Sequence, residues 1–247
     1  MKNIFKNSVI IVFLFIVSNL NAQNTISTVI YKKKVTYNLD KAKEGKAKTL
    51  LQNVSSVVKD LEYELVFDSF ESYFSEIEKL DSEESNTLSN NVARLIGLGN
   101  GQIYMNIKDK KILTQKNLSS DLFLIESKKP QKWKKTNETK QIGKYNCFKA
   151  TTTVFIETVS AGTIEEEVIA WFTPEIPVSF GPAGFGGLPG LIMEIEKGKA
   201  VIYAHKVYLG TAKDKKINIP KRGIKVSEEE FREILKKGSS YYGQYKN

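Results

Sequence analysis

A seventeen-residue stretch, SFGPAGFGGLPGLIMEI at Ser179–Ile195, constrains the fold of this chain more than any other segment. Five glycines and two prolines fall between Gly181 and Ile192, and an apolar run follows. Glycine permits positive φ and close backbone approach, whereas proline fixes φ and reduces the entropy of the unfolded chain. We therefore expect a loop of one defined shape, and its apolar residues predict that it packs on a sheet or caps a cavity.

The spacing of these glycines excludes three catalytic loops. A Walker-type phosphate loop needs G-x-x-x-x-G-K-[ST], and no lysine lies between Ser179 and Met193. A dinucleotide fingerprint needs G-x-G-x-x-G before a helix, whereas Gly184, Gly186 and Gly190 are spaced G-x-G-x-x-x-G. The stretch also lacks the G-x-S-x-G nucleophile elbow of hydrolases. We therefore predict that backbone sterics, and not a reaction, determine this loop.

The first 22 residues have the pattern of a secretory signal peptide. Lys2 and Lys6 provide positive charge, Val9–Val17 is almost continuously apolar, and Ala22 places a small residue at the cut. The apolar run is shorter than the about 20 residues of a membrane-spanning helix. We expect residues 1–22 to be removed. The remaining single β-rich domain, 23–247, is expected to be exported to the periplasm or outer membrane, or secreted, without a transmembrane segment.

The chain is basic, with 37 Lys and Arg against 28 Asp and Glu. The lysines are spread along the sequence and cluster only at 32–34 and 132–135, whereas nucleic-acid binders concentrate charge on one face. This distribution favours a solvated surface and predicts no nucleic-acid partner. The single cysteine, Cys147, permits no internal disulfide, so the fold depends on its hydrophobic core.

Hydrophobic periodicity predicts a mainly β (α+β) fold. A strand pattern begins at Ile26, apolar residues at helical spacing run from Leu50 to Leu61, and Ser227 with Glu230 forms the capping box of a helix at about 227–238. A polar insertion at Asp81–Asn100 is expected to be a loop or a short helix. The remaining strands are joined by short links, which predicts antiparallel pairing: Glu62–Phe67, Glu71–Ile77, Gln102–Ile107, Lys111–Gln115, Leu122–Glu126, Lys132–Thr136, Tyr145–Glu157, Glu165–Phe172, Leu191–Glu196 and Ala200–Tyr208.

Three segments together resemble the GLPGLI family of exported bacterial proteins: GLPGLI at Gly187–Ile192, AWFTPEIPVSFGP at Ala170–Pro182 and IGKYNCFKATT at Ile142–Thr152. The looser match runs from about Thr25 to Tyr208. Members of this family share a signal peptide, a β-rich body, the single cysteine and the W-[FY]-T-P motif, and the activity of the family is uncharacterised. Because some members are associated with energy-coupled outer-membrane receptors, the resemblance implies a setting in envelope transport.

The predicted elements also resemble the half-barrel of lipoprotein-carrier and related periplasmic proteins, with two or three helices packed on a curved antiparallel sheet. In such a fold the glycine-rich loop would partly close a concave, apolar pocket. We therefore expect a non-enzymatic envelope protein that binds an apolar ligand or serves as the accessory partner of an outer-membrane complex. The candidate binding residues belong to the loop and its flanking motif: Trp171, Phe172, Thr173, Pro174, Gly181, Pro182, Phe185, Gly187, Leu188, Pro189, Gly190, Leu191 and Ile192.

The alternative is a thiol-dependent or other hydrolase that uses Cys147. The thiol can be a buried structural group, a nucleophile or a bridge to another molecule, and His205, the only histidine, could pair with it or be an ordinary strand residue. The burial of the thiol is favoured, because nothing in the sequence provides the electropositive setting of a reactive cysteine. One Cys and one His are too few for a zinc site, so neither a metal nor a cofactor is expected. Trp133 and Trp171 are either ligand platforms or buried sheet residues.

Overall fold

The computed structural model describes residues 25–36, 45–78, 88–95, 101–118, 120–128, 131–158, 162–212 and 214–237. The predicted signal peptide, 1–22, and most of the polar insertion lie outside the described residues. None of the helices in the described ranges is both long enough and apolar enough to cross a membrane.

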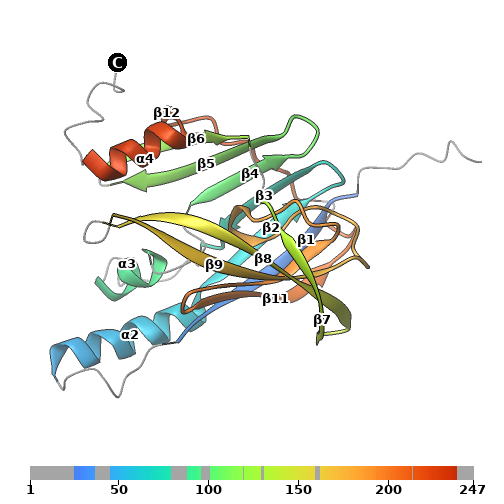
Figure 1. The fold of residues 1–247 in the computed structure, drawn as a ribbon, viewed down its shortest axis with the longest axis horizontal. Helices are drawn as coiled ribbons and strands as arrows, with labels where there is room; N and C mark the ends of the chain where they lie inside the picture. Colours follow the sequence, from blue (N-terminus) through green and yellow to red (C-terminus); the bar gives the residue numbers. More distant parts are fainter. Residues whose placement is uncertain are drawn as a thin grey trace, which may run out of the picture.

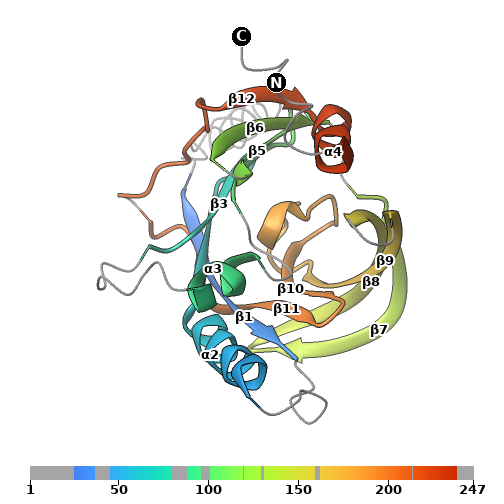
Figure 2. The ribbon, with the colours of Figure 1, turned by 90° about the vertical axis from the view of Figure 1, so that its left-hand side faces the viewer.

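Twelve strands of the described chain form one open, curved sheet, in the order β12-β6-β5-β4-β3-β2-β1-β11-β10-β9-β8-β7. Figure 1 shows the strands side by side, and Figure 2 shows how the sheet curls around an interior. The strands are β1 (Ser27–Val35), β2 (Glu62–Phe67), β3 (Glu71–Glu76), β4 (Gln102–Asn106), β5 (Lys111–Leu118), β6 (Asp121–Ser127), β7 (Lys134–Ile142), β8 (Tyr145–Thr158), β9 (Gly162–Thr173), β10 (Leu191–Lys197), β11 (Ala200–Tyr208) and β12 (Ile224–Ser227).

Three α-helices are described, and Figure 1 shows them towards the same end of the sheet. In α2 (Lys46–Asp60), Val54 and Val58 point into the core, and α3 (Leu88–Leu95) packs beside this helix. In α4 (Glu228–Lys237), Phe231 packs edge-on against Phe123 of β6. The short 3-10 helix η3 (Pro182–Gly184) belongs to the glycine-rich loop.

The hydrophobic core fills the concave face of the sheet. Register pairs Tyr31 with Tyr63, and Tyr63 stacks on Phe74 at 5.6 Å between ring centroids. Because side chains alternate between the two faces of a strand, each interior residue is followed by one that faces outward. The main core includes buried residues of β1 to β4, β8 to β10, both helices α2 and α3, and the glycine-rich loop.

A smaller apolar cluster lies on the outer face of the sheet. Tyr73, Tyr104, Leu113 and Leu124 pack together there, and Ile217 covers them from the segment that follows β11. This segment carries the chain across the outer face to β12.

The structure confirms the expected mainly β fold with an antiparallel sheet and helices packed on it. One pair departs from the antiparallel pattern, because β12 pairs with β6 in parallel. No strand was expected at 224–227. A strand of four residues is too short for its alternation of apolar and polar side chains to be recognised. Its partner strand, β6, lies about a hundred positions earlier, so the pairing leaves no local signal in the sequence. The capping box is confirmed: Ser227 N donates to Glu230 Oε2 at 2.7 Å, and Glu230 N donates to Ser227 Oγ at 3.2 Å.

Candidate binding site

The glycine-rich loop, residues 174–190, connects β9 to β10 and folds into the interior of the curved sheet (Figure 2). Phe180 is fully buried and lies 6.3 Å from the ring centroid of Phe67 on β2, on the facing part of the sheet. Phe185 and Leu188 are also buried in the main core. The loop therefore packs on the sheet, as its apolar residues predict, and its side chains occupy much of the concave face.

Backbone hydrogen bonds give this loop a defined shape. Phe180 and Gly186 form an antiparallel bridge, and Gly187 N donates to Ser179 O at 3.0 Å. Ile192 N donates to Phe180 O at 2.9 Å, so the bridge is attached to the beginning of β10. These bonds satisfy main-chain groups that would otherwise be buried without partners.

Three of its glycines, Gly186 among them, are required because neighbouring atoms leave no room for a Cβ, and not because of φ. A Cβ at Gly190 would overlap the carbonyl oxygen of Thr173, and a Cβ at Gly181 would lie 2.6 Å from Ile192 Cβ. Gly187 is different, because its φ of 86° lies in the region that L side chains rarely adopt. The glycines thus serve the packing of the chain against itself.

Side chains that precede β7 hold the tip of the loop. Trp133 Nε1 donates to Gly186 O at 2.8 Å, and Gln131 Oε1 accepts from Gly186 N at 3.2 Å. The Trp133 ring also packs against Phe185, with centroids 6.1 Å apart. Trp133 is half-buried and lies just before β7, so it supports the loop and is not a buried residue of the sheet.

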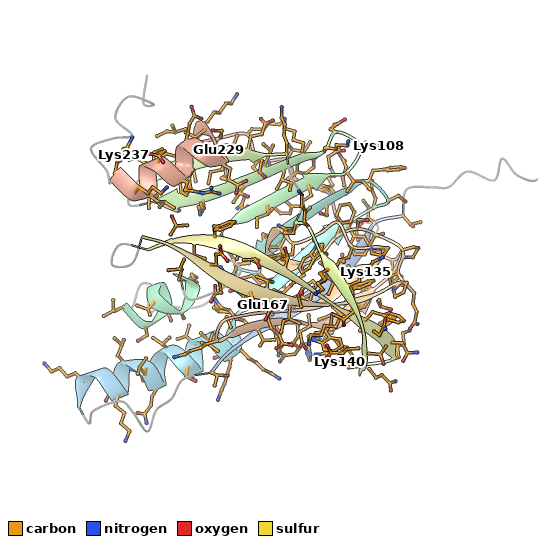
Figure 3. All side chains as sticks on the ribbon, viewed as in Figure 1. Lys108, Lys135, Lys140, Glu167, Glu229 and Lys237 are labelled. Atoms are coloured by element: carbon orange, nitrogen blue, oxygen red, sulfur yellow. The ribbon has the colours of Figure 1, made fainter. Side chains whose placement is uncertain are left out.

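The predicted site residues are divided between the two faces of β9. The register places Phe172 and Trp171 on opposite faces of β9, and both side chains are buried in the main core cluster. Trp171 Nε1 donates to Glu196 Oε1 at 3.0 Å, and Lys140 Nζ lies 4.3 Å from the centroid of its indole ring. Figure 3 shows Lys140 on β7, near the lower edge of the molecule. Trp171 and Phe172 thus belong to the same core cluster as the buried residues of the loop, although they lie on opposite faces of β9.

The remaining motif and loop residues are mostly structural contacts. Thr173 is fully buried and pairs with Leu191, and its hydroxyl accepts from Glu175 N at 3.3 Å. Pro174 begins the turn after β9, and Pro182 begins η3. Pro189 is exposed beside the buried Leu188.

Cys147 lies in β8 and its side chain is fully buried. Burial raises the pKa of this thiol to about 11, although Lys140 acts in the opposite direction. His205 is exposed on β11, and two strands, β9 and β10, separate β11 from β8 in the sheet. Strands lie about 4.8 Å apart, so the two side chains do not meet as a catalytic pair.

A cleft remains between the loop and α4, at the open side of the curved sheet. Figure 2 shows α4 between the β12–β6 end of the sheet and the β8–β9 hairpin. We call this space of about 390 Å³ the α4 cleft; Ala183 and Gly184 of η3 form part of its wall. The other apolar side chains that line it are those of Ile103, Ile112, Ile125, Phe155, Ile156, Phe231 and Leu235. The cleft leaves no signal in the sequence, because its wall combines seven separate parts of the chain: β4, β5, β6, Gln131, β8, η3 and α4.

A larger hollow of about 870 Å³ lies on the outer face, between β5, β6 and the segment before α4. Eight of its fifteen lining residues are charged, compared with three of fifteen in the α4 cleft. Because small-molecule sites are mostly apolar with a few placed polar groups, the α4 cleft is the better candidate. Among the described residues, no group of three or more His, Cys, Asp or Glu is placed to hold a metal ion.

A buried lysine was also missed by sequence reasoning. Lys33 on β1 is 1% exposed, and its Nζ donates to Ala93 O of α3 at 3.2 Å. Burial lowers the pKa of this ammonium group to about 8, and the negative charge of Glu76 opposes the shift. The sequence contained a sign of this burial. Lys33 lies two residues after Tyr31 and four after Val29, so strand alternation places its side chain on the same face as these two apolar residues.

Comparison with known proteins gives a partial family match. The family model "Protein of unknown function (Porph_ging)" matches residues 133–194, which include Cys147, Trp171 and the glycine-rich loop. This match agrees with the expected relationship to an uncharacterised family over that segment. No curated protein sequence matches the chain.

Similar solved structures include two of PNGF-II. The structure in the C2 space group has a TM-score of 0.47 and 15% sequence identity, and the match covers 85% of this chain and 32% of that chain. The structure in the P21 space group has a TM-score of 0.49 and 16% identity, with 85% and 33% covered. The present chain therefore spans about a third of the length of those chains.

Proposed function

We propose that this protein is a non-catalytic binding protein of the cell envelope and that it holds an apolar ligand in the α4 cleft. The observation that carries the proposal is the cleft itself, a space of about 390 Å³ between the glycine-rich loop and α4, in which eight of the fifteen lining residues are apolar. Its size falls within the range of roughly 300–1,000 Å³ typical of small-molecule sites. Its exported location is proposed from the signal-peptide pattern of residues 1–22.

The fold supports a role for the loop as a wall of this site and not as its lid. Phe180, Phe185 and Leu188 of the loop fill part of the concave face, so the ligand is expected beside the loop in the α4 cleft and not beneath it. The ordered loop then presents Ala183 and Gly184 to the cleft at fixed positions. A preformed wall reduces the ordering cost of binding.

The burial of Cys147 favours binding over a thiol-dependent reaction. A thiolate is the reactive form of cysteine, and burial raises the pKa of Cys147 to about 11. The proposal therefore assigns Cys147 to the core. A partnership with an outer-membrane complex is a separate part of the proposal, based on the family resemblance, and co-purification from native membranes tests it.

Binding can be measured with an uncharged fluorescent probe, N-phenyl-naphthylamine, on the mature chain. Thr114 lines the cleft, so Thr114→Phe is expected to fill it and to weaken probe binding at least about tenfold, corresponding to about 1.4 kcal/mol. Thr153→Phe is the matched control, because Thr153 is exposed on β8 and does not line the cleft. The proposal is wrong if the wild-type protein does not bind the probe, or if both variants bind it equally well.

A further inference from the structure

Two lysines from distant strands face the same interior space. Lys116 on β5 pairs with the buried Phe123, and Lys197 on β10 pairs with the buried Val168, so both lie at interior positions of their strands. Five strands separate β5 from β10 in the sheet order. Lys116 lines the α4 cleft and Lys197 lines a second hollow, and Ile156 borders both, so the curvature of the sheet brings the two strands towards the same space. The positive charge of Lys197 adds to the lowering of the pKa of Lys116, of which burial is the main cause.

Lys116 lies within the α4 cleft and has no carboxylate partner in the part of the chain that the structure describes. Its Nζ lies 4.5 Å from the ring centroid of Phe231 on α4, which is a cation–π contact. The other charges nearby are paired: Arg232 bonds to Glu228 at 3.3 Å, and Lys197 lies 3.7 Å from Glu166. Glu228 also lines the cleft, but it is paired with Arg232, so among the described residues Lys116 is a positive group without a carboxylate partner.

A second hollow adjoins this cleft at Ile156. It has a volume of about 530 Å³, and Lys197, Glu166 and Val35 contribute to its lining. Ile156 borders both spaces, so a ligand in the α4 cleft has Lys116 on one side and the basic end of the second hollow beyond it. Because Lys197 is paired with Glu166, Lys116 provides the unpaired positive charge, and an apolar chain with one negative end group beside Lys116 would match these walls.

We propose that the ligand is an amphiphile with a single anionic group, held by Lys116, and with an alkyl chain along Ile103, Ile112 and Leu235. This inference rests on the proposed function and specifies its ligand class. Lys116 is half-buried, and an unpaired charge that is partly removed from water is costly; an anion beside it would compensate that cost through a charge-assisted hydrogen bond. Hydrogen bonds to charged groups contribute more than neutral ones.

The test compares dodecanoate with dodecanol, which have the same alkyl chain, by calorimetric titration below their aggregation limits. Wild-type protein is expected to bind dodecanoate at least about tenfold more tightly than dodecanol. Lys116→Met is expected to abolish that preference while dodecanol binding is retained, and Lys116→Arg is expected to keep it. Lys135→Met, at an exposed position of β7 (Figure 3), is the control and should leave the preference unchanged.

The possible results separate this inference from the proposed function. If the wild-type protein binds both compounds equally, the anionic specificity is wrong and the apolar site stands. If it binds neither compound, both proposals are wrong. Lys116→Met could instead weaken the binding of both compounds to the same extent while its thermal unfolding matches that of wild type. Lys116 would then shape the cleft without selecting the anionic compound, and the inference would be overturned.

Discussion

Tyr31 on β1 donates a hydrogen bond from its hydroxyl to the carbonyl oxygen of Ile192, at 2.7 Å, across the intervening strand β11. Both residues are fully buried. The partner of Tyr31 on β11 is Ala204, whose small side chain leaves room for the ring to pass over it. This bond connects the first strand of the sheet to the point where the glycine-rich loop enters β10, and so connects the loop to the centre of the fold.

Tyr31→Phe should therefore destabilise the protein. The substitution keeps the ring but removes the donor, and the Ile192 carbonyl oxygen loses a buried partner, which costs about 1–3 kcal/mol. The free energy of unfolding in urea measures the effect. Tyr208→Phe is the control, because Tyr208 is 46% exposed at the end of β11. Equal stability of the two variants would contradict the role given to this bond.

Gly190→Ala should be far more destabilising than Gly143→Ala, the same substitution at the turn between β7 and β8. The added Cβ would overlap Thr173 O, and the backbone must move to remove this overlap. We therefore expect the free energy of unfolding to fall by at least about 3 kcal/mol, or the protein not to fold. Gly143→Ala meets no atom within 4 Å, and its φ of 59° costs about 1–2 kcal/mol. Thermal unfolding of both variants provides the comparison. A Gly190→Ala protein as stable as the Gly143→Ala protein would show that close packing does not determine this loop.

Several features of the fold were predictable because they leave local signals. The alternation in β2, β3 and β11 and the capping box of α4 involve neighbouring residues, and their predicted positions agree with the structure within a residue or two. The glycine spacing also predicted a sterically shaped loop. What the sequence did not show is that the loop turns inward, because that depends on how far the sheet curls.

The candidate site was harder to predict, for the same reason. Trp171 and Phe172 are adjacent in a motif, yet strand alternation places them on opposite faces. Conversely, Lys116 and Arg232 are distant in sequence and line one cleft only because α4 returns to the open side of the sheet. The residues of a segment can show that it forms a strand, but they do not show which other strands will face it in the fold.

Lys33 predicts an unusual dependence of stability on pH. Its pKa is about 8 in the folded protein, against an ordinary value of 10.5, so between these values the unfolded chain binds the additional proton and stability rises with pH. The full contribution is about 3 kcal/mol. Below about pH 8 both states are protonated, and the cost of burying the charge is constant.

The comparison of wild type with Lys33→Met isolates this effect. Tyr31 and Tyr63, whose pKa values are raised by burial, lose stability at high pH in both proteins and cancel in the difference. We expect the stability of Lys33→Met relative to wild type to decrease from about pH 7 to about pH 10. Urea unfolding across this range measures it. A difference that does not change with pH would show that Lys33 is not charged and buried as described.

Cys147 should be inert to alkylation in the native protein. Burial raises its pKa from 9.0 to about 11, which reduces the thiolate fraction at neutral pH by roughly a hundredfold, and the fully buried sulfur is also inaccessible. Iodoacetamide followed by mass spectrometry should label it only after unfolding in urea. An exposed thiol introduced by Thr153→Cys in a Cys147→Ala background is the positive control, since Thr153 is solvent-exposed on the same strand. If native Cys147 were labelled as rapidly as that control, the thiol would be accessible and reactive. This result would favour Cys147 as a nucleophile and would contradict the proposal of a non-catalytic protein.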